Sequence, residues 1–116
     1  MSTMSTKIKK IRDAMNTLNV PCYHYFAPSS QKAPYIVWYE EGEASSLEAD
    51  TIKAEQAIAG YVEYFTQTEY DTVVDSIQTA LNGVDHCAWQ YDSVIYGDPT
   101  NDDNNTIHHS WSWEVA

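Results

Sequence analysis

The segment that most limits the possible fold is residues 60–83, GYVEYFTQTEYDTVVDSIQTALNG, because the spacing of its apolar side chains changes within it. Up to Thr66 the apolar residues recur at every second position, as in a half-buried β-strand. Beyond Gln67 they recur at every third or fourth position, as in an amphipathic helix. The sequence therefore predicts a strand over about 55–66 that passes into a helix with almost no loop.

This predicted helix has its own start and stop signals. Thr68 followed three residues later by Asp71 resembles a capping box, and Gly83 is the expected left-handed residue after the last turn. One apolar stripe runs along the helix and is expected to be buried: Tyr70, Val73, Val74, Ile77 and Leu81.

An earlier helix is predicted near the start of the chain, capped by Ser5 or Thr6 and stopped by Val20-Pro21. Residues 1–4 before it are expected to be disordered. Its apolar residues share one face: Ile8, Ile11, Met15 and Leu18. The other face carries four cations, which we expect to be solvated rather than to form an anion site: Lys7, Lys9, Lys10 and Arg12.

Alternating side chains predict the remaining strands: 35–43, 86–96 and 106–115, with a minor strand near 22–26. Loops are expected where prolines, serines and charged residues gather: 27–34, 44–53 and 97–105. The main order α-β-β-α-β-β argues for a single α+β domain over residues 1–116. We expect a mostly antiparallel sheet of four to five strands with two helices packed on one face.

The charge of the chain is acidic and unevenly distributed. The formal net charge is −11; residues 1–53 contain six Lys and Arg and six Asp and Glu, whereas residues 54–116 contain eleven Asp and Glu and no Lys or Arg. Stable binding to nucleic acid needs clustered cations, so it is not expected here. No apolar run is long enough to cross a membrane, no signal peptide is evident at the start, and two cysteines fit a reducing compartment.

Cysteine and histidine occur in three close pairs that would suggest zinc: Cys22 with His24, His86 with Cys87, and His108 with His109. Adjacent residues on a strand point to opposite faces, so the last two pairs cannot hold one ion without a bulge. The usual metal-ligand spacings are also missing. Ordinary strand positions are therefore favoured, and neither a metal nor a cofactor is expected.

Three other groups have residue types suited to catalysis or to calcium binding: Asp85-His86-Cys87, the cluster Glu40, Glu41 and Glu43, and the loop Asp98–Asn104. Sequence neighbours do not make a catalytic triad, and the glutamates are better explained as charges that protect a strand edge. The loop lacks the Gly and Glu of an EF-hand. We therefore expect no catalytic residue and no enzymatic activity.

Aromatic side chains are abundant, at 13% of the chain, and two helices cover only one face of a sheet. Tyr and Trp are enriched in protein interfaces, so another subunit is a candidate for the second cover. The residues concerned are Tyr35, Trp38, Tyr39, Tyr61, Tyr64, Phe65, Tyr70, Trp89, Tyr91, Tyr96, Trp111 and Trp113.

These segments together resemble small tail proteins of long-tailed phages and prophages of Gram-positive bacteria. The resemblance rests on YIVWYEE, on GYVEYFTQ running into TEYDTVVDSIQTALNG, and on the final HHSWSWEV, and it covers about residues 35–115. The most similar group is the tail terminator, or tail-completion, family. Its members are α+β subunits that form rings, commonly hexameric, at the end of the tail tube.

The resemblance implies a non-enzymatic structural protein of the virion tail or neck, assembled in the host cytoplasm. Its partners would be itself, tail-tube proteins and head-connector proteins. DNA would pass through the ring without stable binding, and no membrane is involved. The candidate interface residues come from two loops and from strand faces: Trp38, Tyr39, Glu48, Asp50, Asp102, Asp103, Trp111 and Trp113.

Acidity alone fits a second hypothesis equally well, namely a DNA mimic that inhibits a nucleic-acid-binding protein. A mimic needs carboxylates spaced like phosphates and can be a monomer or dimer, whereas a ring subunit needs an interface with its neighbours. A small metal-dependent or thiol enzyme is the least favoured alternative.

Overall fold

The change of spacing within residues 60–83 marks the junction that organises the fold. Strand β3 (Ile58–Thr66) ends just before residues 67–71, and helix α2 (Thr72–Asn82) begins directly after them. The other elements, in chain order, are α1 (Met4–Asn16), β1 (Cys22–His24), β2 (Tyr35–Glu43), β4 (Cys87–Tyr96) and β5 (Ile107–Val115). They belong to a computed structural model that describes residues 3–44, 56–97 and 105–116.

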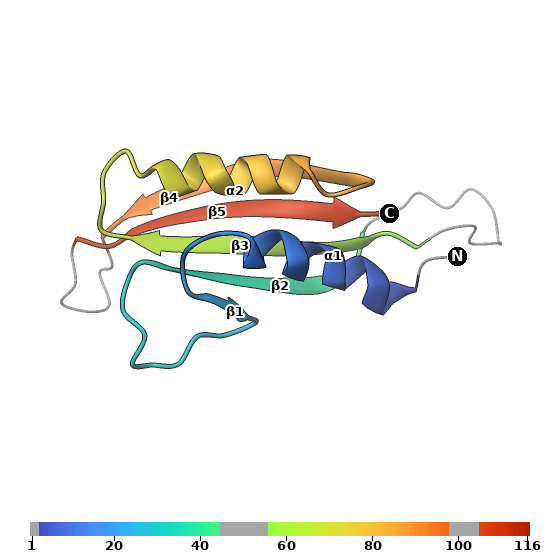
Figure 1. Cartoon of the computed structure of the whole chain (residues 1–116), viewed down its shortest axis with the longest axis horizontal. Helices are drawn as coiled ribbons and strands as arrows, with labels where there is room; N and C mark the ends of the chain where they lie inside the picture. Colours follow the sequence, from blue (N-terminus) through green and yellow to red (C-terminus); the bar gives the residue numbers. More distant parts are fainter. Residues whose placement is uncertain (1–2, 45–55, 98–104) are drawn as a thin grey trace.

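The strands form one five-stranded sheet in the order β1-β2-β3-β5-β4 (Figure 1). The pairs β2–β3, β3–β5 and β5–β4 are antiparallel, as expected, but β1 lies parallel to β2. The sheet is therefore mixed. The minor strand expected near 22–26 joins in parallel because residues 25–34 return the chain to the end of the sheet at which β1 began.

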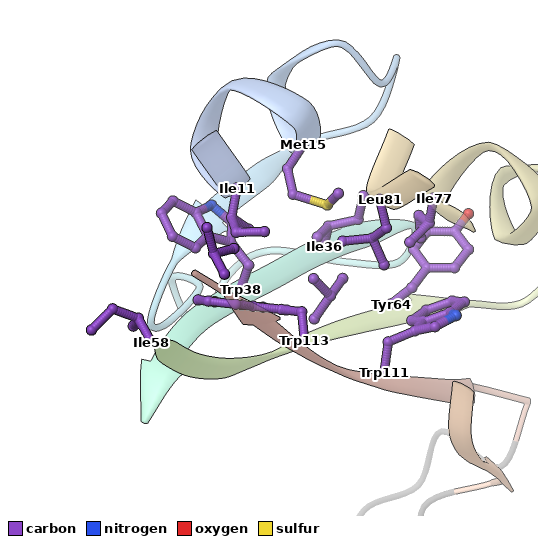
Figure 2. Close-up of a cluster of buried hydrophobic side chains, with 12 residues drawn as sticks. Ile11, Met15, Ile36, Trp38, Ile58, Tyr64, Ile77, Leu81, Trp111 and Trp113 are labelled. Atoms are coloured by element: carbon purple, nitrogen blue, oxygen red, sulfur yellow. The ribbon is translucent and has the colours of Figure 1, made fainter. Parts of the chain in front are cut away.

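Both helices lie on the same face of the sheet, so the chain forms a single α+β domain with all its helical cover on one side (Figure 1). Ile11 and Met15 from α1 and Ile77 and Leu81 from α2 pack onto that face (Figure 2). The strands contribute alternating residues to the same core: Ile36, Trp38, Ile58, Val62, Tyr64, Trp111, Trp113 and Val115. Alternation along residues 106–115 predicted the strand β5, but it did not show which of the two faces points inward.

Gly60 allows the largest core side chain near it to approach the backbone of β3. It lies opposite Trp113 in the antiparallel register, and a Cβ at Gly60 would overlap both the Trp113 ring and the Tyr39 carbonyl oxygen. Any side chain at Gly60 would push the Trp113 indole and the backbone of β2 away from β3. The glycine therefore permits Trp113 to be 99% buried between helix and sheet.

Asp71 joins the end of β3 to the start of α2. The hydroxyls of Tyr64 and Thr66 each donate a 2.6 Å hydrogen bond to its Oδ2, and its Oδ1 accepts the N–H of Val73 at 2.9 Å. Burial opposes the charge, but these hydrogen bonds together lower the pKa of Asp71 below its ordinary value. One carboxylate thus caps the helix and holds two side chains of the strand.

The helix ends differ from the expected ones in detail. Tyr70 is not part of the buried stripe: it precedes the cap with φ 58°, and its side chain is 92% exposed. Gly83 ends α2 with φ −81°, which is right-handed, because its N–H still bonds the carbonyls of the last turn. Helix α1 begins at Met4 with Thr3 as its cap, two or three residues before the expected Ser5 or Thr6, since Thr3 Oγ1 accepts the N–H of Thr6.

The cationic face of α1 is only partly solvated. Lys7 is 2% exposed and its Nζ donates to the carbonyl oxygen of Gln56, so the aliphatic part of the side chain belongs to the packed layer. Lys9 and Arg12 are exposed. Over the described residues, no helix is both long and apolar enough to span a bilayer.

The buried position of Ile77 yields a stability prediction. Replacing Ile77 with Ala leaves a cavity between α2 and the sheet and is expected to lower the free energy of unfolding by ~2–5 kcal/mol. Ser76→Ala, at an exposed position of the same helix, should change it by no more than about 0.5 kcal/mol. Urea denaturation followed by tryptophan fluorescence measures both values, and equal stabilities for the two variants would contradict this packing.

Candidate functional site: the open face of the sheet

The face of the sheet opposite the helices is the candidate functional surface. In the parts of the chain that the structure describes, no helix packs on it (Figure 1). We call it the open face. It comprises Tyr35, Val37, Tyr39 and Glu41 of β2, Ala59, Tyr61, Glu63 and Phe65 of β3, His108, Ser110, Ser112 and Glu114 of β5, and Ala88, Gln90, Asp92, Ser93 and Ile95 of β4.

Aromatic rings cover the part of the open face formed by β2, β3 and the start of β5. Tyr35 stacks on Phe65 with ring centroids 4.7 Å apart, and Phe65 stacks on His108 at 4.3 Å. Tyr39 and Tyr61 form a second, tilted pair at 5.6 Å. These side chains are only partly buried, and each ring packs against a neighbouring ring of the same face.

A hydrogen-bonded pair lies among these rings. Glu63 Oε1 and His108 Nε2 are 2.7 Å apart, with side chains about one-quarter exposed (23% and 26%). The bond from His108, with a further one from Tyr39, lowers the pKa of Glu63 although burial opposes this. Burial and the neighbouring Glu63 carboxylate raise the pKa of Tyr39 to about 12, so its hydroxyl remains a donor at neutral pH.

Small side chains on β4 and β5 leave a hollow beside the aromatic half. Its volume is about 300 Å³, and its lining includes the small side chains of Ala59, Ala88 and Ser112. Tyr61, Glu41 and Glu114 stand around it. The open face thus combines flat aromatic surface with a shallow depression that has carboxylates at its rim.

Two β-bulges add carboxylates to the open face. The register shifts between Glu40 and Gly42 in β2, which brings Glu41 to the hollow, and between Tyr91 and Ser93 in β4. The second bulge places Asp92 where its Oδ1 accepts a 3.1 Å hydrogen bond from Ser112. Bulges re-aim side chains in this way. With Glu63 and Glu114, four carboxylates share the face, and its described residues include no Lys or Arg.

The residues that the sequence predicted for an interface lie in different parts of the structure. The prediction that three tryptophans form an interface is wrong. Their side chains fill the domain's own core under the helices, with 3%, 0% and 1% exposed for Trp38, Trp111 and Trp113. Alternation along the strands indicates which side chains share a face, but it does not show which face the helices cover. Tyr39 does lie on the open face. Four acids fall outside the described residues: Glu48, Asp50, Asp102 and Asp103.

Sequence reasoning missed the Glu63–His108 pair and the stack of Tyr35, Phe65 and His108. The residues of the pair are separated by 45 positions, and only the antiparallel register of β3 and β5 brings them together. Alternation did place Phe65 and Tyr61 on one face of a strand. No signal in a single sequence gives the partner strand or its register.

The described residues offer little for metal or nucleophilic chemistry. They contain no cluster of three or more His, Cys, Asp or Glu side chains arranged to hold a metal ion. Burial raises the pKa of both Cys22 and Cys87 to about 11, so both thiols are protonated at neutral pH. The His108 ring is held between Glu63 and Phe65, an arrangement that fixes the ring in place rather than activating a neighbouring hydroxyl.

Comparison with known proteins adds no family assignment. The chain matches no protein-family model, and no curated protein gives a significant match to it. The open face is therefore interpreted from its own geometry and charge.

The lowered pKa of Glu63 predicts a contribution to acid stability. Because the folded pKa lies below its ordinary value of 4.5, the unfolded chain takes up the proton more readily. The stabilisation is present above pH 4.5 and is lost as the pH falls through the folded pKa. Glu63→Gln and His108→Gln should therefore both lose less stability than the wild type on acidification. Urea midpoints between about pH 7 and about pH 3 measure this, and curves parallel to the wild type would contradict it.

The raised thiol pKa values predict low reactivity. Iodoacetamide at pH 8 should alkylate Cys22 and Cys87 much more slowly in the folded protein than in urea, since only the thiolate reacts and burial disfavours it. Mass spectrometry with time gives the two rates. A double Cys→Ala variant should keep a cooperative unfolding transition with a modest loss of stability. Rapid alkylation of the native protein would show that a thiol is activated.

Proposed function

We propose that the protein is a non-enzymatic structural subunit of a phage or prophage tail. In this proposal it terminates the tail tube and joins tail to head as a homo-oligomeric ring, such as the hexamer common in the family it resembles. The observation that carries the proposal is the open face. Four strands of nine or ten residues carry helices on one side only in the described parts of the chain, and the other side presents partly exposed aromatic rings.

Such a surface suits contact with other protein subunits. Aromatic side chains supply contact area at low entropic cost, and the stacked rings of Tyr35, Phe65 and His108 are already ordered before any partner binds. The Glu63–His108 pair fixes this arrangement further. Tail-tube and head-connector proteins are the partners that the resemblance to tail terminators implies.

The charge of the chain supports passage of DNA rather than its retention. A formal −11 on each subunit would surround a channel with negative potential, which repels phosphate. The virion tail or neck, assembled in the host cytoplasm, is the proposed location.

A DNA-mimic inhibitor is the second candidate, and the four carboxylates of the open face favour it. Glu41, Glu63, Asp92 and Glu114 lie together without Lys or Arg among the described residues of that face. The aromatic half argues for the first proposal, since a mimic needs a dense row of solvated charge, whereas here Glu63 is bonded to His108 and Tyr39.

Deleting the gene from the phage or induced prophage that encodes it tests the proposal. We expect heads and tails that are not joined, with tails free or abnormally long, counted by electron microscopy. Wild-type protein supplied in trans should restore virions. Tyr61→Arg, on the open face, should not, whereas Tyr96→Arg should, because Tyr96 is 72% exposed but lies on the other face of the sheet.

Thermal unfolding of both variants separates a folding defect from an assembly defect. Normal virions from the deletion strain would contradict the proposal. In that case, capture of a nucleic-acid-binding host protein that DNA displaces would support the mimic instead.

A further inference from the structure

Of the three exposed cations among the described residues, Lys9 and Arg12 lie on α1, and Lys32 lies in the segment between β1 and β2. Lys9 and Arg12 project from α1 beside a groove of about 560 Å³ between this helix and the β1 edge of the sheet. Met4, Ile8 and Trp38 supply its apolar lining. We call this surface the α1 groove.

Two carboxylates lie near these cations, and both already have partners. Glu40, within the groove, forms a 2.7 Å hydrogen bond with His24, whose ring stacks on Trp38. Asp13 contacts Arg12 at 2.9 Å, and the side chains of Arg12 and Asp13 are 47% and 68% exposed. Arg12 therefore shares part of its charge with Asp13, while the exposed Lys9 adds a further positive charge beside the apolar groove.

The opposite side of the molecule has the complementary character. The open face carries Glu41 and Glu114 at exposed positions beside its hollow and Asp92 at an exposed position of β4, with Tyr61 as the adjacent apolar surface. Because α1 and the open face lie on opposite sides of one sheet, a single copy cannot bring them together (Figure 1).

We propose that the α1 groove of one copy docks on the open face of a second copy, with Lys9 and Arg12 against the rim carboxylates Glu41 and Glu114. This inference rests on the proposed ring and names the surfaces that would build it. The contact is head-to-tail, since each subunit uses two different surfaces. Repeated contacts of this kind close into a ring when the rotation permits, or form a filament when it does not.

Charge distinguishes this contact from the symmetric alternative. A two-fold pairing of open face with open face would bring four carboxylates of one copy against the same four of the other. Like charges at such a contact disfavour it. Docking of the α1 groove instead places cations beside acids and apolar lining against Tyr61, and it gives every subunit the same environment.

Charge exchange tests the contact in purified protein. Lys9→Glu with Arg12→Glu, or Glu41→Lys with Glu114→Lys, should each weaken self-association by about tenfold or more. The quadruple variant, which exchanges both surfaces and keeps the wild-type net charge, should associate as the wild type does. Mixing the two double variants should also restore association. Sedimentation velocity at low salt measures all of these.

A matched control has the same net charge but only one exchanged surface. It combines Lys9→Glu and Arg12→Glu with Asp75→Lys and Asp85→Lys, at exposed positions of α2 and of the turn after it. This variant should remain dissociated. If it associates as well as the full exchange, net charge rather than the proposed contact governs assembly, and the inference fails.

Other outcomes separate this inference from the proposed function. Oligomers that are insensitive to all these substitutions would overturn the α1 groove contact and leave a ring formed by other surfaces. A wild type that stays monomeric up to its solubility limit would also overturn the inference. The virion counts from the deletion strain, which do not depend on these variants, decide the tail function in either case.

Discussion

The carboxylate of Asp71 is the interaction on which the arrangement of layers depends. It accepts hydrogen bonds from Tyr64 and Thr66 at the end of β3 and from the backbone of Val73 at the start of α2. The chain must reverse from sheet to helix within residues 67–71, and this one group fixes where the helix begins. Ile77 and Leu81 then meet Trp111 and Tyr64 across the core. Without that anchor, the helix would lose both its cap and its direction over the sheet.

Because both helices lie on one face of the sheet, that face holds the core and the other face keeps the partly exposed aromatic rings. The core side of the sheet receives Trp38, Trp111 and Trp113, whose bulk fills the space beneath two short helices. The opposite side keeps the remaining aromatic rings, which shield each other only partly. A protein of this design presents a broad surface of ordered aromatic rings, and aromatic side chains are enriched in protein interfaces.

Charge differs between the helical side of the sheet and the open face. The cations of the N-terminal helix lie above the sheet, and two bulges together with β3 and β5 direct acids below it. Charge on the helical side is mixed, because Asp13 of α1 and Asp75 of α2 are exposed there, whereas the described residues of the open face include four carboxylates and no Lys or Arg. In the proposed head-to-tail ring, Lys9 and Arg12 of one copy would meet carboxylates of the next copy.

The sequence alone determined the elements, because side-chain spacing reports local backbone geometry: the alternation in 35–43 and 106–115 and the helical stripe of Ile77 and Leu81 are confirmed. It also indicated surplus aromatic surface. Tertiary structure decided which aromatic side chains were surplus, since Trp111 and Trp113 are buried while Tyr61 and Phe65 are not. It also decided the parallel pairing of β1, the exposure of Tyr70 and the meeting of Glu63 with His108. These depend on strand order, register and helix placement, which arise from contacts between residues far apart in the chain and leave no trace in local spacing.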